Sequence, residues 1–295
     1  MPLASLDSGV DIFYDERGEG EPLMLIMGIG CQMIYWPEAF CDELAASGFR
    51  VIRFDHRDIG LSSKLDHMGV PPLLPTLFSG LLGVRVLSPY GLEDMAEDVA
   101  GLLDYLGIDS AHVVGASMGG MVAQTLAFTH PHRVRSLVSI MSTTGESGHY
   151  MSEIKALRAI FGSPPKTRDQ AVDRGVEVWR VIGSTGFPFD EAGTRHRAGL
   201  SWDRGNHPPG FLRHLGAIAM TGDRTPRLRF VRAPTLVLHG SVDPLIRPLG
   251  GHLTHKAIPD ARLEIFEGMG HDLPEPLWPR FATMIGDNAS RPRRS

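Results

Sequence analysis

Short apolar runs alternate with amphipathic segments through the first half of this chain. The apolar runs have the length of buried strands, and they cover residues 10–14, 23–27, 50–54, 111–114 and 134–141. Apolar residues recur at helical spacing between them, over residues 37–46, 92–106 and 118–129. Strands that alternate with helices in this way form βαβ units. The chain is therefore expected to adopt an α/β fold, with a mostly parallel sheet flanked by helices.

The alternation stops near Thr143 and resumes after Pro226. Between these residues the sequence has helical periodicity and prolines, but no convincing buried strand. Apolar strands return at residues 235–239 and 262–266, followed by a helix at about 278–285. We predict one core from residues 1–142 and 227–289, with an inserted helical cap at 143–226 over the strand ends. The basic end of the chain, residues 290–295, is expected to form a disordered tail.

One predicted strand-to-helix turn carries a serine between glycines. The run Gly115-Ala116-Ser117-Met118-Gly119 follows the strand at 111–114 and opens the next helix. A serine on such a sharp turn has a strained backbone, and its hydroxyl projects free of the sheet. The residues two before and two after it come close together, which favours glycine at both places. This context favours a nucleophilic serine over an ordinary glycine-rich turn.

A serine hydroxyl becomes a good nucleophile only when a base removes its proton. The chain has 13 histidines, and His271 is the best placed because it lies on a glycine-flanked loop after the last predicted strand. His56 and His239 are expected to make structural hydrogen bonds instead. A carboxylate must then hold the imidazole in one tautomer. Asp243, just beyond the preceding strand, is preferred for that role, and Glu146 is the rival acid.

Two backbone N–H groups are expected to stabilise the negative charge that develops on an attacked carbonyl oxygen. One belongs to Met118, the residue after the serine. The other is assigned to Ile29, in a Gly-Ile-Gly turn after the second predicted strand, although these glycines can also serve only to shape the turn. Gly28, Met33 and Trp36 are the candidate substrate-binding residues.

The charged turn from Asp55 to Asp58 also follows a strand, so it invites a catalytic interpretation. A structural role is preferred, in which hydrogen bonds within the turn anchor Arg57 to neighbouring carboxylates. Another irregular stretch, from Ser62 to Tyr90, is apolar but is interrupted by prolines and glycines. It is either a long loop that packs its own side chains or a flap that lines substrate access.

Several blocks of this sequence resemble the α/β-hydrolases, and among them the aclacinomycin methylesterase-like carboxylesterases. The blocks are residues 24–28, the Trp36-Pro37 pair, residues 51–60, residues 112–119 and residues 268–271. They fall in the family's order and cover nearly the whole chain outside the predicted cap. The order serine, aspartate, histidine is also that of the family. Many members carry His-Gly where this chain has Met27-Gly28, but a backbone N–H does not need that histidine.

The resemblance implies a serine esterase with a helical cap and no metal or organic cofactor. Together with the residues above, it predicts hydrolysis of a small-molecule carboxylic ester through an acyl-enzyme on Ser117, with His271 and Asp243 completing the triad. The apolar candidate residues favour esters with a hydrophobic portion. The alternatives are C–C bond or lactone hydrolysis, or perhydrolysis, by the same triad, and a non-catalytic ligand receptor.

Composition excludes several other classes of function. The formal net charge is -5, with no long charged run, which argues against a nucleic-acid partner. No run of apolar residues is long enough to span a membrane, and the N-terminus lacks a signal peptide, so a cytoplasmic location is expected. Two cysteines, Cys31 and Cys41, cannot build a disulfide framework and have no metal-binding spacing. The sequence leaves open whether the chain forms a homodimer.

Overall fold

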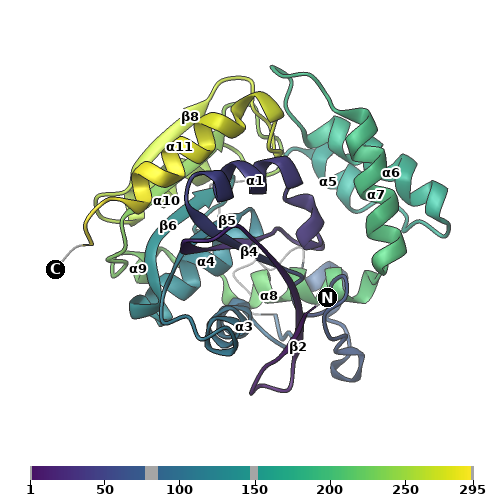
Figure 1. Ribbon diagram of the computed structural model, residues 1–295. Coiled ribbons are helices and arrows are strands. Elements are labelled where there is room, and N and C mark those ends of the chain that lie inside the picture. The colour runs from purple at the N-terminus through teal and green to yellow at the C-terminus, as the bar shows by residue number, and fades with distance from the viewer. Residues whose placement is uncertain (1, 77–85, 147–151, 294–295) are drawn as a thin grey trace.

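The computed structural model describes residues 2–76, 86–146 and 152–293. Within these ranges eight strands form one sheet, in the order β1-β2-β4-β3-β5-β6-β7-β8 (Figure 1). The strands are β1 (Leu3–Ser5), β2 (Asp11–Arg17), β3 (Glu21–Ile26), β4 (Phe49–Phe54), β5 (Ala111–Ala116), β6 (Val134–Ile140), β7 (Thr235–Gly240) and β8 (Arg262–Phe266). The first two are antiparallel to their neighbours, and every later pairing is parallel. The predicted α/β class with a mostly parallel sheet is confirmed.

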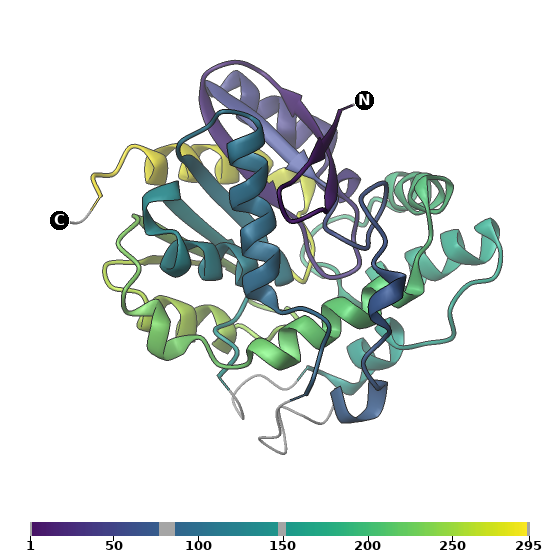
Figure 2. The ribbon, with the colours of Figure 1, turned by 90° about the horizontal axis from the view of Figure 1, so that it is seen from below.

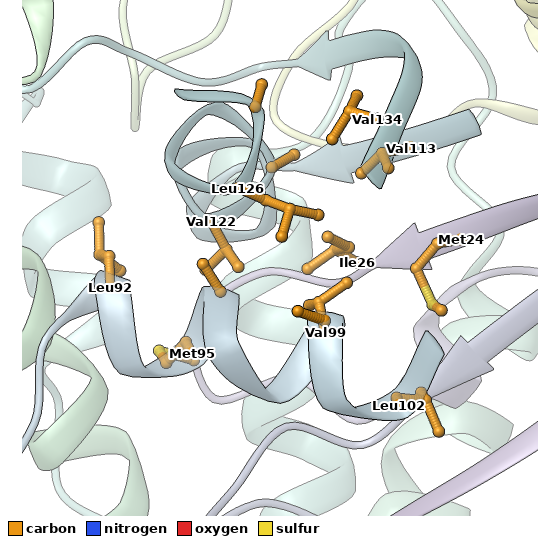
Figure 3. Close-up of a cluster of buried hydrophobic side chains, with 14 of the residues drawn as sticks. Met24, Ile26, Leu92, Met95, Val99, Leu102, Val113, Val122, Leu126 and Val134 are labelled. Carbon is orange, nitrogen blue, oxygen red and sulfur yellow. The ribbon is translucent and has the colours of Figure 1, made fainter. Parts of the chain in front are cut away.

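The central strands β3, β5 and β6 are buried along most of their length because both faces of the sheet are covered. In β3, Met24 and Ile26 contribute to one core layer, whereas Leu23 and Leu25 contribute to the other. This period of two is the pleat of a strand buried on both sides. Figure 3 shows the first layer, where the Val113 side chain of β5 lies with Val99, Val122 and Leu126 of the covering helices.

Helices cover both faces of the sheet (Figures 1 and 2). One face is covered by α3 (Leu92–Tyr105), α4 (Met118–Thr129), α9 (Thr225–Leu228) and α10 (Leu249–Ala257). The opposite face is covered by α1 (Glu38–Ala46) and α11 (Trp278–Ala289). Four short 3₁₀ helices lie in the described loops, at Met33–Tyr35, Asp66–Met68, Pro131–Arg133 and Glu275–Leu277.

The chain between β6 and β7 is helical where it is described. It contains α5 (Ile154–Ile160), α6 (Arg168–Ile182), α7 (Glu191–Arg204) and α8 (Pro208–Thr221), and it ends with α9. Helices α5, α6 and α7 gather at one side of the sheet (Figure 1), and α8 runs from them back toward α3. We call α5 to α8 with their connecting loops the helical segment. The absence of a strand here was predicted for residues 143–226, of which 147–151 lie outside the described residues.

The sequence analysis did not predict β1 or α10. It also left the stretch from Ser62 to Tyr90 open, and the part of that stretch at residues 77–85 lies outside the described residues, so the two interpretations stay open. The predicted tail is described only as far as Arg293, and Arg291 donates to the carbonyl oxygens of Thr235 and Asp260. No helix in the described ranges is both long enough and apolar enough to span a membrane.

Candidate active site

Ser117 occupies the junction between β5 and α4. Its backbone has φ 56° and ψ -121°, a conformation that a residue with a side chain rarely adopts. The Ser117 N–H donates to the Ile140 carbonyl over 2.9 Å, and the Ser142 hydroxyl donates to the Ser117 carbonyl over 2.8 Å. Both bonds tie the turn to β6 and its following loop. Backbone strain held in place by such bonds is characteristic of functional sites.

The glycines around Ser117 are required by close backbone contacts. A Cβ on Gly115 would lie 2.2 Å from the carbonyl oxygen of Gly119, and one on Gly119 would lie 2.0 Å from the carbonyl oxygen of Ile26. The two residues therefore approach each other as the sequence predicts. The second contact also presses the start of α4 against the end of β3, so the serine turn lies directly beside the loop that follows β3.

His271 and Asp243 come from loops after β8 and β7, and the structure brings both to Ser117. His271 Nε2 lies 3.0 Å from Ser117 Oγ, and His271 Nδ1 lies 2.7 Å from Asp243 Oδ2. The other Asp243 oxygen accepts the N–H groups of Leu245 and Ile246, each over 2.9 Å. An ionised Asp243 can only accept, so this network assigns the proton to Nδ1 and leaves Nε2 able to take the serine proton.

These three side chains are almost fully buried: Ser117 is 8% exposed, His271 5% and Asp243 2%. Electrostatic interactions are stronger in such an environment than in water. His239 lies close by, with its Nε2 3.6 Å from Asp243 Oδ2. Burial lowers the pKa of His239, so its ring is neutral, and it donates from Nε2 to the Ile246 carbonyl over 2.7 Å. His239 therefore makes the structural hydrogen bond expected of it.

The loop after β3 lies against the serine. A Cβ on Gly28 would lie 3.2 Å from Ser117 Cβ and 3.7 Å from Ser117 Oγ. Ile29 follows directly, and Met118 is the first residue of α4, where N–H groups have no partner within the helix. In the parts of the chain that are described, neither the Ile29 nor the Met118 N–H donates to a protein acceptor. Both remain able to bind a ligand oxygen.

The contacts described for the other two predicted substrate-binding residues are with residues other than Ser117. Met33 is buried, and its N–H donates to Asp55 Oδ1 over 2.8 Å. Trp36 is fully buried and stacks on Phe40 in the core layer beneath α1 and α11. Its described contacts are those of a core residue, and a substrate-binding role for either residue stays a prediction.

The charged turn after β4 makes the hydrogen bonds that its structural interpretation predicts. Arg57 binds the buried carboxylate of Asp98 through two hydrogen bonds of 2.6 and 2.7 Å. Asp58 accepts two hydrogen bonds from Arg213 of α8, of 2.8 and 2.6 Å, and one from the Tyr90 hydroxyl. His56 Nε2 lies 2.9 Å from the Met27 carbonyl, which places it behind the loop after β3.

Glu146, the rival acid, makes its described contact away from His271, and neither cysteine offers an alternative nucleophile. The Glu146 N–H donates to Thr144 Oγ1, and within the described residues its carboxylate has no contact with His271. Cys31 and Cys41 are free thiols, and burial raises their pKa values to about 12 and about 11, so neither is a ready nucleophile.

Sequence reasoning missed the residues that fasten the helical segment around the site. Two of them are His214, whose Nδ1 accepts the Gly30 N–H over 3.4 Å, and Ser184, which contacts the loop that carries His271. No local signal marks either residue. Each lies within a helix or loop of ordinary composition and finds its partner from a distant part of the sequence.

The sequence profile of a family described as "alpha/beta hydrolase fold" matches residues 21–275. Rhodomycin D methylesterase DnrP of Streptomyces peucetius is 30% identical over 282 residues, which cover 87% of this chain and 88% of that protein. A 2-hydroxy-6-oxononadienedioate/2-hydroxy-6-oxononatrienedioate hydrolase of Burkholderia vietnamiensis is 29% identical over 88% of this chain and 84% of its own length.

Solved structures share the architecture. The enol-lactonase from Burkholderia xenovorans LB400 superposes with a TM-score of 0.74 at 21% identity, over 98% of this chain and all of the lactonase. At that identity the likeness concerns the fold alone. The profile match extends over residues 21–275, so it includes the strands and loops that carry Ser117, Asp243 and His271.

Proposed function

The chain belongs to the α/β-hydrolase family and is a hydrolase, and on that premise we propose that it cleaves carboxylic esters through an acyl-enzyme formed on Ser117. The observation that carries the proposal is the continuous path from Ser117 Oγ through His271 to Asp243, with links of 3.0 and 2.7 Å. The methylesterase likeness supports the choice of an ester as substrate. The helical segment is proposed to act as the cap over this site.

In the first step His271 Nε2 takes the proton of Ser117, and Oγ attacks the ester carbonyl carbon. The carbonyl oxygen becomes an oxyanion, which the N–H groups of Ile29 and Met118 stabilise. Asp243 stays ionised and stabilises the protonated imidazole. The tetrahedral intermediate then collapses, and His271 gives its proton to the departing alcohol oxygen.

In the second step water attacks the acyl-enzyme, with His271 as general base. The same two N–H groups stabilise the second oxyanion, and collapse releases the carboxylic acid and restores the Ser117 hydroxyl. Because one histidine serves as base and then as acid in each half-reaction, it must be neutral at the start of each. The hydrogen bond from Nδ1–H to Asp243 keeps the correct tautomer ready.

The substrate is proposed to have a hydrophobic portion. A Cβ on Gly30 would lie 2.7 Å from the ring of Phe211, so this aromatic residue of α8 lies against the proposed oxyanion loop. Phe211 in turn makes an edge-to-face contact with Phe161, with ring centroids 5.9 Å apart. Gly28 lies beside Ser117 and leaves room for the reacting group. An ester with an apolar acyl or alkyl group suits such surroundings better than a small charged one.

A second candidate is hydrolysis of a bond other than an ester. The relative from Burkholderia vietnamiensis acts on a dicarboxylic acid whose name contains no ester linkage, so its reaction must break another bond. The same nucleophile, base and oxyanion donors can serve both reactions, because each passes through an attacked carbonyl. We rank this candidate second because the methylesterase has the higher identity, 30% against 29%, and is covered over more of its own length, 88% against 84%.

The test is hydrolysis of p-nitrophenyl esters, from acetate to palmitate, by the wild type and by Ser117→Ala. We expect turnover by the wild type and a fall of about 10⁴-fold or more in the variant. Ser136→Ala is the matched control, since Ser136 is a buried, hydrogen-bonded serine on β6 whose loss leaves the site intact. The chain-length profile reports how much of an apolar acyl group the site accepts.

Covalent labelling by a fluorophosphonate separates the alternatives. Labelling of the wild type but not of Ser117→Ala, without ester turnover, would favour the second candidate, to be assayed with a ring-cleaved dienoic diacid. A folded, monodisperse wild type that neither turns over esters nor becomes labelled would exclude both enzymatic readings and leave the ligand receptor.

A further inference from the structure

The loop after α6 lies directly against the loop that carries His271. The His271 N–H donates to the Ile182 carbonyl over 2.7 Å. The N–H groups of Thr185 and Gly186 donate to the Gly268 carbonyl over 3.1 and 2.9 Å. Three main-chain hydrogen bonds thus join two loops that lie more than 80 positions apart in the sequence.

One side chain spans both neighbours of His271. The Gly270 N–H donates to Ser184 Oγ over 2.9 Å, and Ser184 Oγ donates to Asp272 Oδ1 over 2.5 Å. The Ser184 N–H adds a second bond to the same Asp272 oxygen, over 3.0 Å. Because the Gly270 N–H fills an acceptor position on the hydroxyl, the Ser184 proton is free to point at Asp272.

The two loops are in backbone-to-backbone contact. A Cβ on Gly270 would lie 2.3 Å from the carbonyl carbon of Gly183, and one on Gly186 would lie 2.7 Å from Cα of Gly268. At these two contacts backbone meets backbone, so there is no flexible side chain between the loops that could adjust if one loop moved. A shift of the loop after α6 is therefore transmitted to the backbone of His271.

We propose that Ser184 is a positioning residue for His271, through hydrogen bonds to the residues on either side of it. The inference rests on the proposed function, since it assigns His271 the role of the base. Asp243 fixes the orientation of the imidazole, but only from one side of the ring. Ser184 and the Ile182 carbonyl fix the backbone from which the ring extends, and so set the distance from Nε2 to Ser117.

Small displacements at this place are costly to the reaction. A misplacement of about 1 Å of a reacting group costs on the order of 10²-fold in rate. The described hydrogen bonds of Ser184 go to Gly270 and Asp272 and not to Ser117, so we expect its loss to leave substrate binding intact. The expected signature is a lower kcat at an unchanged KM.

The experiment compares wild type, Ser184→Ala, Asp272→Asn and Ser136→Ala, with active enzyme counted by fluorophosphonate titration. We expect Ser184→Ala to lower kcat about tenfold to a hundredfold per titrated site, with KM within about twofold and an altered pH profile of kcat. Asp272→Asn keeps an acceptor for both Ser184 donors, so its loss should be smaller. Ser136→Ala reports what a lost buried hydrogen bond does by itself, and its kcat should match the wild type.

A structural readout keeps the test independent of turnover. In the wild type the His271 Nδ1 proton, bound to Asp243, should give a downfield proton NMR signal, which Ser184→Ala should weaken or shift. If the wild type hydrolyses no ester but Ser184→Ala still weakens or shifts the proton signal, the proposed function is wrong and the positioning role stands. Ser184→Ala with wild-type kcat, pH profile and proton signal overturns the positioning role and leaves the proposed function standing.

Discussion

Among the described contacts that fasten the helical segment to the core, two attachments near the active site are built from different interactions. On the side of the oxyanion loop, α7 and α8 are held by charges: Arg213 binds Asp58, and both side chains are fully buried. Arg204 binds the buried Asp55 in the same region. On the side of His271, the loop after α6 is held by main-chain hydrogen bonds and by Ser184. We call these the ionic attachment and the hydrogen-bonded attachment.

The two attachments differ in how they respond to the loss of one partner. A buried charge that loses its counter-ion keeps the full cost of being removed from water. A main-chain hydrogen bond between uncharged groups contributes only about 0.5–1.5 kcal/mol net. The ionic attachment should therefore dominate the stability of the helical segment. The hydrogen-bonded attachment holds the proposed base, so its importance should be greater for the reaction than for stability.

The largest expected effect follows from breaking the ionic attachment at Arg213. Arg213→Met keeps an unbranched apolar side chain in place of the arginine stem but leaves the Asp58 carboxylate buried without its cation. We expect the free energy of unfolding to fall by about 3–5 kcal/mol, as measured by urea denaturation. Arg168→Met is the control, since the Arg168–Asp203 pair joins α6 and α7 with both side chains half exposed. A similar loss in both variants would mean that burial does not set the strength of the ionic attachment.

The second prediction concerns acid. Burial lowers the pKa of His214 to about 4 and that of His56 to about 3, so both are neutral in the folded protein. Below about pH 6.5 the unfolded chain binds protons that the folded chain does not. The stability that these residues contribute is therefore present above the unfolded pKa and is lost as the pH falls toward the folded pKa.

We expect His214 alone to account for a fall of about 3 kcal/mol in the free energy of unfolding between pH 6.5 and 4. His214→Gln should have a shallower dependence on pH in this window, whatever its stability at neutral pH. The measurement is a series of urea titrations across the window, with the exposed His255→Gln as control. Equal slopes for His214→Gln and wild type would contradict the prediction.

The edge of the sheet that carries Ser117, Asp243 and His271 could be predicted because its signals are local. A glycine-flanked serine after a strand, and an aspartate and a histidine after two later strands, all fall at the carboxyl ends of parallel strands, and these ends share one edge. The attachments could not be predicted. Arg213 and its partner Asp58 are separated by 155 positions in the sequence, and Ser184 and Asp272 by 88. Neither pair follows a pattern along the chain that would reveal the contact.

The two elements that the sequence did not predict, α10 and β1, each lack a local signal for a different reason. Helix α10 includes Gly250 and Gly251, each of which costs a helix about 1 kcal/mol. A Cβ at Gly251 would lie 2.8 Å from the His239 ring, so close packing on β7 accounts for the glycine against its helical preference. Strand β1 has only three residues, too few to show an alternating pattern.

The third prediction tests the hydrogen-bonded attachment by steric means. In Gly186→Ala the new Cβ would lie 2.7 Å from Gly268 Cα, and Gly268 has a φ of 73° that leaves it little room to adjust. We expect a loss of about 1–3 kcal/mol in unfolding free energy and a lower kcat in the ester assay. Gly286→Ala in α11 has open space around its Cβ and should be neutral or slightly stabilising. Unchanged kcat in Gly186→Ala would show that the loops move independently.

The smallest expected effect concerns Asp272. Its contribution to the free energy of unfolding should change with pH in the direction opposite to that of His214. Burial raises the pKa of Asp272, against the hydrogen bonds from Ser184 and the charge of a protonated His271, while Asp243 raises it further. Because the folded-state pKa lies above the unfolded value, the contribution of Asp272 to stability is present at low pH and is lost as the pH rises through the folded pKa. His214, which lies beside the ionic attachment, and Asp272 of the hydrogen-bonded attachment should therefore respond to acid in opposite directions.

Asp272→Asn isolates this contribution, because the amide oxygen still accepts the Ser184 hydroxyl and N–H but carries no charge. We expect the variant to lie within about 1 kcal/mol of wild type in unfolding free energy near pH 4. Its stability relative to wild type should then increase as the pH rises toward 7, as measured by urea denaturation at both values. A difference that stays constant with pH would mean that Asp272 is solvated well enough to ionise without cost. The Asp272 carboxyl would then add no pH dependence to the hydrogen-bonded attachment, and the response to acid would come from the buried histidines beside the ionic attachment.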